Sequence, residues 1–339
     1  MNIKDKLKSL PETPGVYLMK DKDSNIIYIG KSKCLKNRVS QYFTPSYSPS
    51  KKISRMIKFI DDIEIIKTDT ELDALLLECS LIKKVQPMYN TLMKNDKKYA
   101  YFKIDMNENY PTLECVMNKN DESLYFGPYT SLKKLEDISD ILINYFKIRK
   151  CRGTNKLRGC INYDLDFCLG PCKISNKQEY DNSIQNLINT LNGKNSDILI
   201  DLNDKMMKAT QILDFEKALK YREDIEKIKS IIHKSEAINY IKRNKAILLT
   251  VNIDDISKKI YILKGIKIIY SKLVKTEEIK TISLKNEIKR YINKDLIINT
   301  IENISYVKKE ELDIAYIICS YLKYSTDCEY LEIGNGLKY

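Results

Sequence analysis

Two short runs near the start of the chain are almost entirely apolar. Residues 15–19, "GVYLM", and residues 26–30, "IIYIG", are rich in β-branched and aromatic residues. Between them the stretch "KDKDSN" at 20–25 has the composition of a turn. The pattern predicts a β-hairpin over residues 14–32.

The spacing then becomes helical, at about 33–43 and again at about 50–60, and residues 62–68 alternate as a third strand. Thr68, followed three residues later by Glu71, has the pattern of a capping box, so we expect a helix from there to about Lys84. Pro87 ends it. The order strand, strand, helix, helix, strand, helix predicts a small mixed α/β domain over residues 1–95.

The rest of the chain gives weaker signals. We expect strands at 99–106 and 111–118, a turn at 124–131, a helix at 131–146, helices throughout 177–236, strands within 240–275, and helices near 284–293 and 309–323. The predicted fold class is therefore mixed α/β. A three-stranded antiparallel sheet flanked by helices is followed by a cysteine-cluster unit at 96–176, a helical region at 177–236 and an α/β region at 237–339.

The net charge of +12 changes the picture, because a basic chain favours a polyanionic partner, nucleic acid first and an anionic membrane surface second. The excess is largest in residues 1–100, which hold 19 Lys and Arg against 12 Asp and Glu. The charged N-terminus predicts no secretory signal, and no apolar run is long enough for a membrane span. With nine cysteines we therefore expect a cytoplasmic protein whose thiols bind metal and do not form disulfides. A single histidine, His233, excludes hydrolytic mechanisms that need two.

The hairpin brings candidate chemistry together. Tyr17 and Tyr28 lie on paired strands, with Lys31 and Arg38 close behind in sequence. A phenol can donate or accept a proton, Lys31 could favour the phenolate, and a guanidinium grips phosphate through paired hydrogen bonds. Glu78, between apolar neighbours on the predicted helix, could hold a hard cation such as Mg²⁺. This set suggests metal-assisted phosphodiester hydrolysis, although two tyrosines in a hairpin can equally be ordinary core residues.

The stretch "PGVYLM…IIYIGKSKCLKNRVSQYF" resembles the GIY-YIG nuclease family, in the form found in the UvrC branch. The resemblance implies that Tyr17 is the general base or its relay, that Arg38 stabilises charge on the phosphate, and that Glu78 binds Mg²⁺ or Mn²⁺. The full catalytic set that it implies is Tyr17, Tyr28, Lys31, Arg38, Tyr42, Glu78 and Asn90.

Four cysteines are concentrated in a short stretch with the spacing C-x8-C-x7-C-x3-C: Cys151, Cys160, Cys168 and Cys172. Four thiolates without histidine fit a structural Zn²⁺ or a [4Fe–4S] cluster, and idle thiols are the alternative. The run resembles the cysteine motif of the UvrC family, which implies the iron–sulfur cluster, with zinc as the alternative.

Basic residues flank the cysteines without intervening acids. Arg149, Lys150, Arg152 and Arg158 form a strip that could contact DNA phosphates, or could simply be a solvated loop.

Further along, Phe215, Leu219 and Ile225 recur at helical spacing, with Arg222 among them. On pattern alone this is an ordinary core hairpin. Its resemblance to the UVR motif of excinuclease subunits implies that these four residues contact a UvrB partner.

The resemblance covers residues 1–236 and implies a DNA-repair endonuclease subunit. It would make a metal-dependent nick on the 3′ side of a lesion in double-stranded DNA, together with UvrB and indirectly UvrA. UvrC proteins continue with an RNase-H-like domain, of which residues 237–339 could be a remnant or a replacement, so we expect a shortened relative that nicks one side. The alternatives are a non-catalytic adaptor that binds DNA and UvrB, and a stand-alone GIY-YIG excinuclease of the Cho type.

Overall fold

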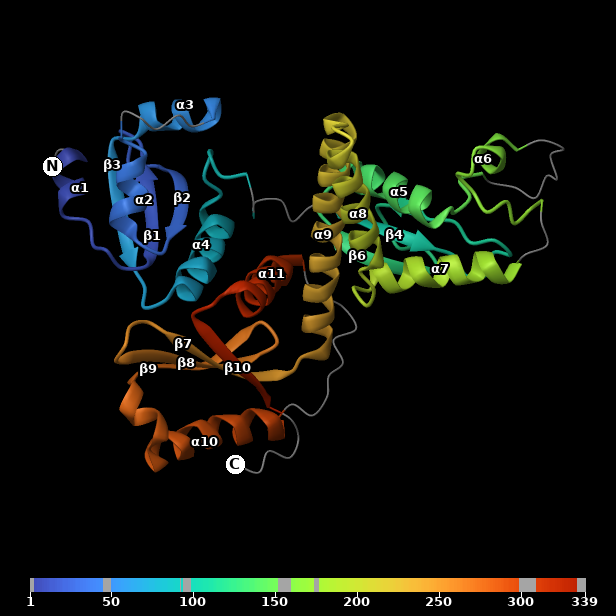
Figure 1. The fold of residues 1–339 in the computed structure, drawn as a ribbon. Coiled ribbons are helices and arrows are strands. Elements are labelled where there is room, and N and C mark those ends of the chain that lie inside the picture. Colours follow the sequence, from blue (N-terminus) through green and yellow to red (C-terminus); the bar gives the residue numbers. More distant parts are fainter. Residues whose placement is uncertain are drawn as a thin grey trace. The chain divides into compact units, whose positions relative to one another are not determined.

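A computed structural model describes residues 3–44, 50–91, 93, 99–151, 160–173, 177–298 and 309–333. Its contacts divide the chain into two compact units, drawn in Figure 1. One unit combines residues 1–95 with residues 240–339, and the other comprises residues 96–239. The mixed α/β class predicted from the sequence is confirmed.

The N-terminal part contains the predicted three-stranded antiparallel sheet, in the order β2-β1-β3. The predicted element order is confirmed, and a short N-terminal helix precedes it. The elements are α1 (Ile3–Lys8), β1 (Gly15–Lys20), β2 (Ile26–Ser32), α2 (Leu35–Gln41), α3 (Lys51–Phe59), β3 (Asp62–Lys67) and α4 (Glu71–Val85).

Both faces of this sheet are covered, which explains why its central strand is almost entirely apolar. Tyr17 and Met19 face a cluster formed with α2 and α3, whereas Val16 and Leu18 face α4. Because successive side chains of a strand point to opposite faces, β1 separates two small cores.

Helix α4 begins later than the sequence pattern suggested. The Thr70 side chain accepts a hydrogen bond from the Asp73 N–H at 3.2 Å, and the Asp73 carboxylate accepts one from the Thr70 N–H at 3.2 Å. The capping box is therefore Thr70 with Asp73, and the prediction of Thr68 with Glu71 is wrong. The helix ends at Val85, and a left-handed residue, Gln86, precedes Pro87 as expected.

The second unit combines a small antiparallel sheet, in the order β5-β4-β6, with long helices. Its elements are β4 (Ala100–Ile104), β5 (Glu114–Val116), β6 (Leu124–Tyr129), α5 (Leu132–Phe146), α6 (Ile161–Asp164), α7 (Lys177–Leu191), α8 (Asp197–Gln211) and α9 (Phe215–Arg243). The turn predicted at 124–131 is wrong. Its Gly127-Pro128 pair is accommodated in β6, an edge strand whose pairing has a register irregularity.

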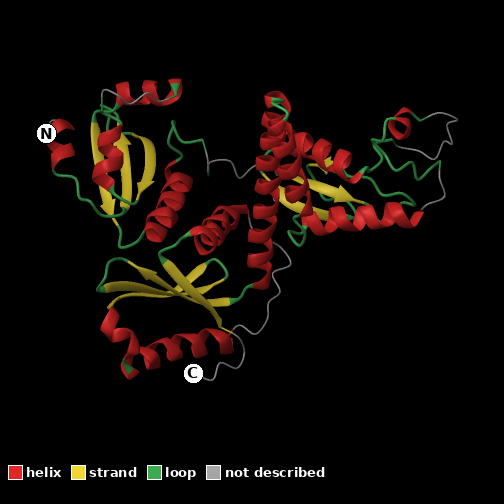
Figure 2. Ribbon diagram, viewed as in Figure 1, coloured by secondary structure: helices red, strands yellow, loops and turns green. Residues whose placement is uncertain are grey.

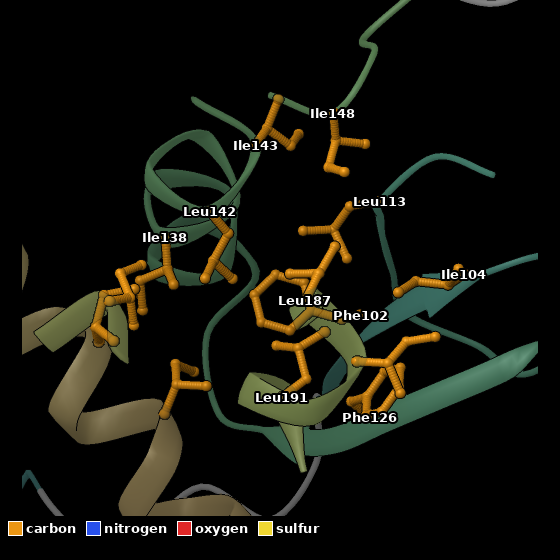
Figure 3. Close-up of a cluster of buried hydrophobic side chains, with 14 of the residues drawn as sticks. Phe102, Ile104, Leu113, Phe126, Ile138, Leu142, Ile143, Ile148, Leu187 and Leu191 are labelled. Carbon is orange, nitrogen blue, oxygen red and sulfur yellow. The ribbon is translucent and has the colours of Figure 1, made fainter. Parts of the chain in front are cut away.

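One apolar core holds this unit together. Figure 3 shows Phe102 of β4, Leu142 of α5 and Leu187 of α7 pointing into the same cluster. Ile225 and Ile228 of α9 are buried in it as well. The helices are thus positioned by burial of their apolar stripes and less by local propensity.

The C-terminal residues form an antiparallel sheet in the order β10-β7-β8-β9, seen with its helices in Figure 2. Its elements are β7 (Ala246–Asn252), β8 (Ser257–Lys264), β9 (Lys267–Lys275), the 3₁₀ helix η1 (Thr276–Lys280), α10 (Ile282–Ile298), α11 (Lys309–Tyr324) and β10 (Cys328–Ile333). Strand β10 was not predicted. Among the described residues, no helix has the length and apolarity needed to span a membrane.

Candidate functional site

Three tyrosines from separate elements converge beside the N-terminal sheet. The Tyr17 and Tyr42 hydroxyls are hydrogen-bonded at 2.9 Å, and both rings are almost fully buried. The Tyr17 ring centre lies 6.2 Å from that of Tyr28 and 6.0 Å from that of Tyr42. The structure thus brings the three predicted tyrosines into one cluster.

Gly30 makes room for this cluster. It lies opposite Tyr17 across β1 and β2, and a Cβ atom at this position would stand 2.3 Å from the Tyr17 hydroxyl oxygen. Any other residue would push the tyrosine away, so the glycine of the second motif is a steric requirement of the site.

Arg38 lies beside the tyrosines on α2. Its guanidinium carbon stands 5.3 Å from the Tyr42 ring centre, and one of its nitrogens donates to Gln41 Oε1 at 2.9 Å. Burial raises the pKa of Tyr17 and Tyr28, and the nearby Arg38 charge opposes this rise at both. An open depression of about 720 Å³ lies along this helix, lined by Ser32, Lys33, Cys34, Asn37, Arg38, Ser40, Gln41 and Thr44.

Burial outweighs the arginine at both tyrosines. It raises the pKa of Tyr17 and of Tyr28 well above that of a free phenol, and the nearby Tyr42 adds to the effect. Lys31 was expected to favour the phenolate, but its ammonium group is paired with Glu71 at 2.6 Å. The raised pKa keeps the Tyr17 and Tyr28 phenols protonated at neutral pH.

Glu78 of α4 supplies the negative charge of the site. Burial raises the pKa of this half-buried carboxyl, although one of its oxygens accepts the Lys31 backbone N–H at 3.0 Å. Its charge also contributes to the raised pKa of Tyr28. A half-buried carboxylate that is costly to ionise is well suited to a hard cation.

No three His, Cys, Asp or Glu side chains of the described residues are grouped as a metal site. Glu78 is a residue that could hold a divalent cation such as Mg²⁺, which prefers oxygen ligands.

Asn90 connects the end of this domain to β2. Its side-chain oxygen accepts the Ile29 N–H at 3.0 Å, and its amide nitrogen donates to the Ile29 carbonyl at 2.8 Å. Ile29 stands between Tyr28 and Gly30, so Asn90 fixes the strand segment that carries both. Its contacts are those of a residue that positions the site.

The four cysteines differ in burial, with Cys168 buried and Cys151 exposed. Burial raises the pKa of Cys168, and the other three thiols raise it further, so all four lie within electrostatic range. Among the described residues, no three of these thiols are grouped as ligands of one metal ion.

The predicted basic strip is corrected at Arg149. This side chain is only 6% exposed, and its Nε donates to the Cys151 carbonyl at 3.0 Å, so it is a structural residue and the prediction of a DNA contact is wrong. Lys150 is exposed and pairs with Asp140 at 2.8 Å. Arg152 and Arg158 lie outside the described residues.

The α8–α9 segment has two kinds of apolar residue. Phe215 and Leu219 are 65% and 55% exposed, and Arg222 is exposed beside them. Ile225 is buried in the core of its unit, so its predicted contact with a partner is wrong. Of the apolar residues predicted to lie on one helical face, Phe215 and Leu219 are therefore exposed and Ile225 is buried.

Comparison with known proteins relates this site to a family. Residues 13–91 match the family described as "UvrC-like GIY-YIG domain", and residues 99–190 match "UvrC/Cho excinuclease, middle domain". The chain is 42% identical to the GIY-YIG N-terminal endonuclease domain of UvrC from Thermotoga maritima, and the match covers 96% of that solved chain and 26% of this one, with a TM-score of 0.24. The chain belongs to the UvrC-like GIY-YIG family. This relation rests on the two family matches.

Curated relatives extend the match beyond the nuclease domain. "UvrABC system protein C" of Alkaliphilus oremlandii is 39% identical over 73% of this chain and 41% of the relative. The protein of the same name from Clostridium acetobutylicum is 42% identical over 69% of this chain and 40% of the relative. This UvrC-like chain thus spans about two fifths of the length of the curated relatives that it matches.

Glu71 and Lys33 lie beside the site of this UvrC-like chain and were not predicted as site residues. Glu71 pairs with Lys31 at 2.6 Å and with Lys33 at 3.0 Å. Burial disfavours its ionisation, but the hydrogen bonds from both lysines outweigh it and lower the Glu71 pKa. Glu71 precedes Glu78 by two helical turns, which places both carboxylates on one face of α4. The seven-residue spacing of Glu71 and Glu78 in the sequence is the signal from which Glu71 could have been predicted as a second carboxylate beside the site.

Proposed function

We propose that this chain is a metal-dependent endonuclease that nicks one strand of lesion-bearing double-stranded DNA on the 3′ side, in nucleotide excision repair with UvrB. The observation that carries the proposal is the convergence of Tyr17, Tyr28 and Tyr42 with Arg38, beside the half-buried carboxyl of Glu78. This combination offers proton relay, charge stabilisation and cation binding in one place.

In the proposed reaction a water oxygen bonds to phosphorus, the bond from phosphorus to one strand oxygen breaks, and the departing oxygen takes a proton from solvent. When Tyr17 donates to Tyr42 across their 2.9 Å hydrogen bond, the Tyr17 oxygen can accept a hydrogen bond from the attacking water. As the new bond forms, the water proton passes to Tyr17, the Tyr17 proton passes to Tyr42, and the Tyr42 proton passes to solvent, so both phenols end neutral. Arg38 stabilises the negative charge that develops on the phosphate oxygens.

Glu78 would hold a Mg²⁺ or Mn²⁺ ion, which supplies charge neutralisation at the leaving oxygen when bound. The related Thermotoga maritima domain is described as bound to magnesium as its catalytic cation, in agreement with this choice.

Incision of an end-labelled duplex with a single lesion tests the proposal. With UvrA, UvrB and Mg²⁺, the wild-type chain is expected to give one nick on the 3′ side of the lesion. UvrB-dependent binding without any nick would instead identify a non-catalytic adaptor. A nick that needs neither UvrA nor UvrB would favour the stand-alone alternative.

The exposed start of α9 is the part of the helical region that we propose contacts UvrB. Changing Phe215 and Leu219 together to serine is expected to lower UvrB affinity about tenfold or more, because exposed aromatic and aliphatic anchors dominate such contacts. Met106→Ser removes an exposed apolar side chain elsewhere in the same unit and is the control. Equal UvrB binding by the double variant and the wild type, measured by titration, would contradict this contact.

Iron–sulfur or zinc binding by the four cysteines stays a prediction from the sequence. The iron and zinc content of anaerobically purified protein, with its visible absorbance, tests that prediction.

A further inference from the structure

Helix α4 has two apolar faces, and each packs against a different sheet. Ala74 and Ile82 lie in the cluster formed with β1 and β2. Leu72 and Cys79 lie in a second cluster with side chains of β7, β8 and α11. Because both faces are buried, α4 is packed against the C-terminal region as well as against the N-terminal sheet.

Polar contacts fasten the first turn of α4 to β8. The Thr70 and Tyr261 hydroxyls are hydrogen-bonded at 2.6 Å, and Lys259 pairs with Asp69 at 2.7 Å and with Asp73 at 2.9 Å. Tyr261 is fully buried, and the Lys259 and Asp73 side chains are 12% and 19% exposed, so the contacts to Thr70 and Asp73 are little screened by solvent. Thr70 and Asp73 are the residues of the capping box, so β8 binds the group that begins the helix.

Further contacts act beyond the first turn. Lys83 of α4 pairs with Asp313 of α11 at 2.9 Å. Asp327, just before β10, lies 3.8 Å from Lys33, which in turn pairs with Glu71 at 3.0 Å. The C-terminal region therefore reaches α4 in both halves and also a residue that lines the Arg38 depression.

The position of α4 determines where its carboxylates lie. Lys31 binds Glu71 through its ammonium group and Glu78 through its backbone N–H, so the two carboxylates and β2 are linked at a single residue. A shift of the first turn of α4 would strain this link and displace Glu78.

We infer that the C-terminal sheet, strands β7, β8, β9 and β10, together with α11, is a brace that holds α4 and so positions Glu78 for its cation, with Lys259 and Tyr261 as positioning residues. This gives the C-terminal strands a role in the nuclease site, and it rests on the proposed function of Glu78 as a cation ligand.

Mg²⁺-induced thermal stabilisation of the full chain tests the inference without depending on cleavage. Lys259→Met and Tyr261→Phe are each expected to raise the Mg²⁺ concentration for half-maximal stabilisation by about tenfold, the lower end of the effect of outer-shell substitutions. Lys259→Arg keeps the charge and is expected to retain a value near that of the wild type.

Two matched controls remove the same groups from the other side of the brace. Lys272 pairs with Glu287 of α10 at 2.8 Å, and Tyr270 lies in a cluster with Ile262 and Ile333. Lys272→Met and Tyr270→Phe are therefore expected to leave the Mg²⁺ half-saturation unchanged.

The outcomes separate the two proposals. A wild-type chain that Mg²⁺ does not stabilise would overturn the cation role of Glu78, and the inference with it. If Mg²⁺ stabilises the wild type and the brace variants with the same half-maximal concentration, the brace inference is overturned but the cation role of Glu78 is not. If Lys259→Met fails to fold, amide hydrogen exchange of Tyr261→Phe still tests the inference. We expect residues 71–78 to exchange faster in Tyr261→Phe than in Tyr270→Phe. Equal exchange rates in the two variants would contradict the brace.

Discussion

Replacing Arg38 with alanine is expected to lower the rate of Mg²⁺-dependent strand cleavage by about 10²- to 10³-fold, the usual loss when one charge-stabilising donor is removed. The exposed guanidinium packs on the Tyr42 ring, so the variant should lose only about 1 kcal/mol of folding free energy or less. Single-turnover cleavage, with urea denaturation of the same sample, measures both effects.

Lys36 on the same helix provides the control for charge. It pairs with Glu12 at 2.8 Å and does not line the depression, so Lys36→Ala should cleave at nearly the wild-type rate. Arg38→Lys is expected to recover only part of the activity, because an ammonium group lacks the planar fork that binds phosphate through two hydrogen bonds. If Arg38→Ala cleaves at the wild-type rate, Arg38 has no part in the cleavage reaction.

Replacing Glu78 with glutamine is expected to lower cleavage by about 10³-fold, because the amide cannot hold a divalent cation as a carboxylate does. Glutamine can still accept the Lys31 N–H, so the local hydrogen bond is kept. Glu64 on β3 pairs with Lys20 at 2.5 Å, and Glu64→Gln is the matched control. The loss should appear in calorimetric Mg²⁺ titrations as well as in cleavage, and unchanged Mg²⁺ binding by Glu78→Gln would contradict the assignment.

The raised pKa of Glu78 also predicts how stability depends on pH. A carboxyl whose pKa is higher in the folded chain than in the unfolded chain contributes stability that is fully present below the unfolded pKa and is lost as pH rises through the folded pKa. At neutral pH the metal-free Glu78→Gln variant should therefore melt at a higher temperature than the wild type. Mg²⁺ should reverse this order, because the cation needs the ionised carboxylate and binds more weakly as pH falls through the Glu78 pKa.

The N-terminal domain could be predicted because its signals are local. The strand alternation, the turn composition and Pro87 each act within a few residues, and they gave the right order of elements. The roles of the tyrosines, Arg38 and Glu78 were predicted from the resemblance to the GIY-YIG family, and the close approach of Gly30 to Tyr17 gives a steric reason for the glycine of the second motif.

The errors come from properties that only tertiary packing determines. Arg149 carries a charge and was predicted to face DNA, yet the fold buries it, and Ile225 was assigned to a partner although the unit needs it in its core. The brace was equally out of reach of sequence reasoning, since Thr70 and Tyr261 are 191 residues apart. Short-range patterns carry no information about which distant strand will cover a helix.

Strand cleavage by the purified full chain tests the central claim most directly. A single-turnover assay on an end-labelled, lesion-bearing duplex with UvrA and UvrB should compare the wild type in Mg²⁺, the wild type in EDTA, and Arg38→Ala in Mg²⁺. The site described here predicts a single nick in the first reaction and none at a comparable rate in the other two. Equal cleavage in all three reactions, or none in the first, would contradict a nuclease site built from these tyrosines, Arg38 and Glu78.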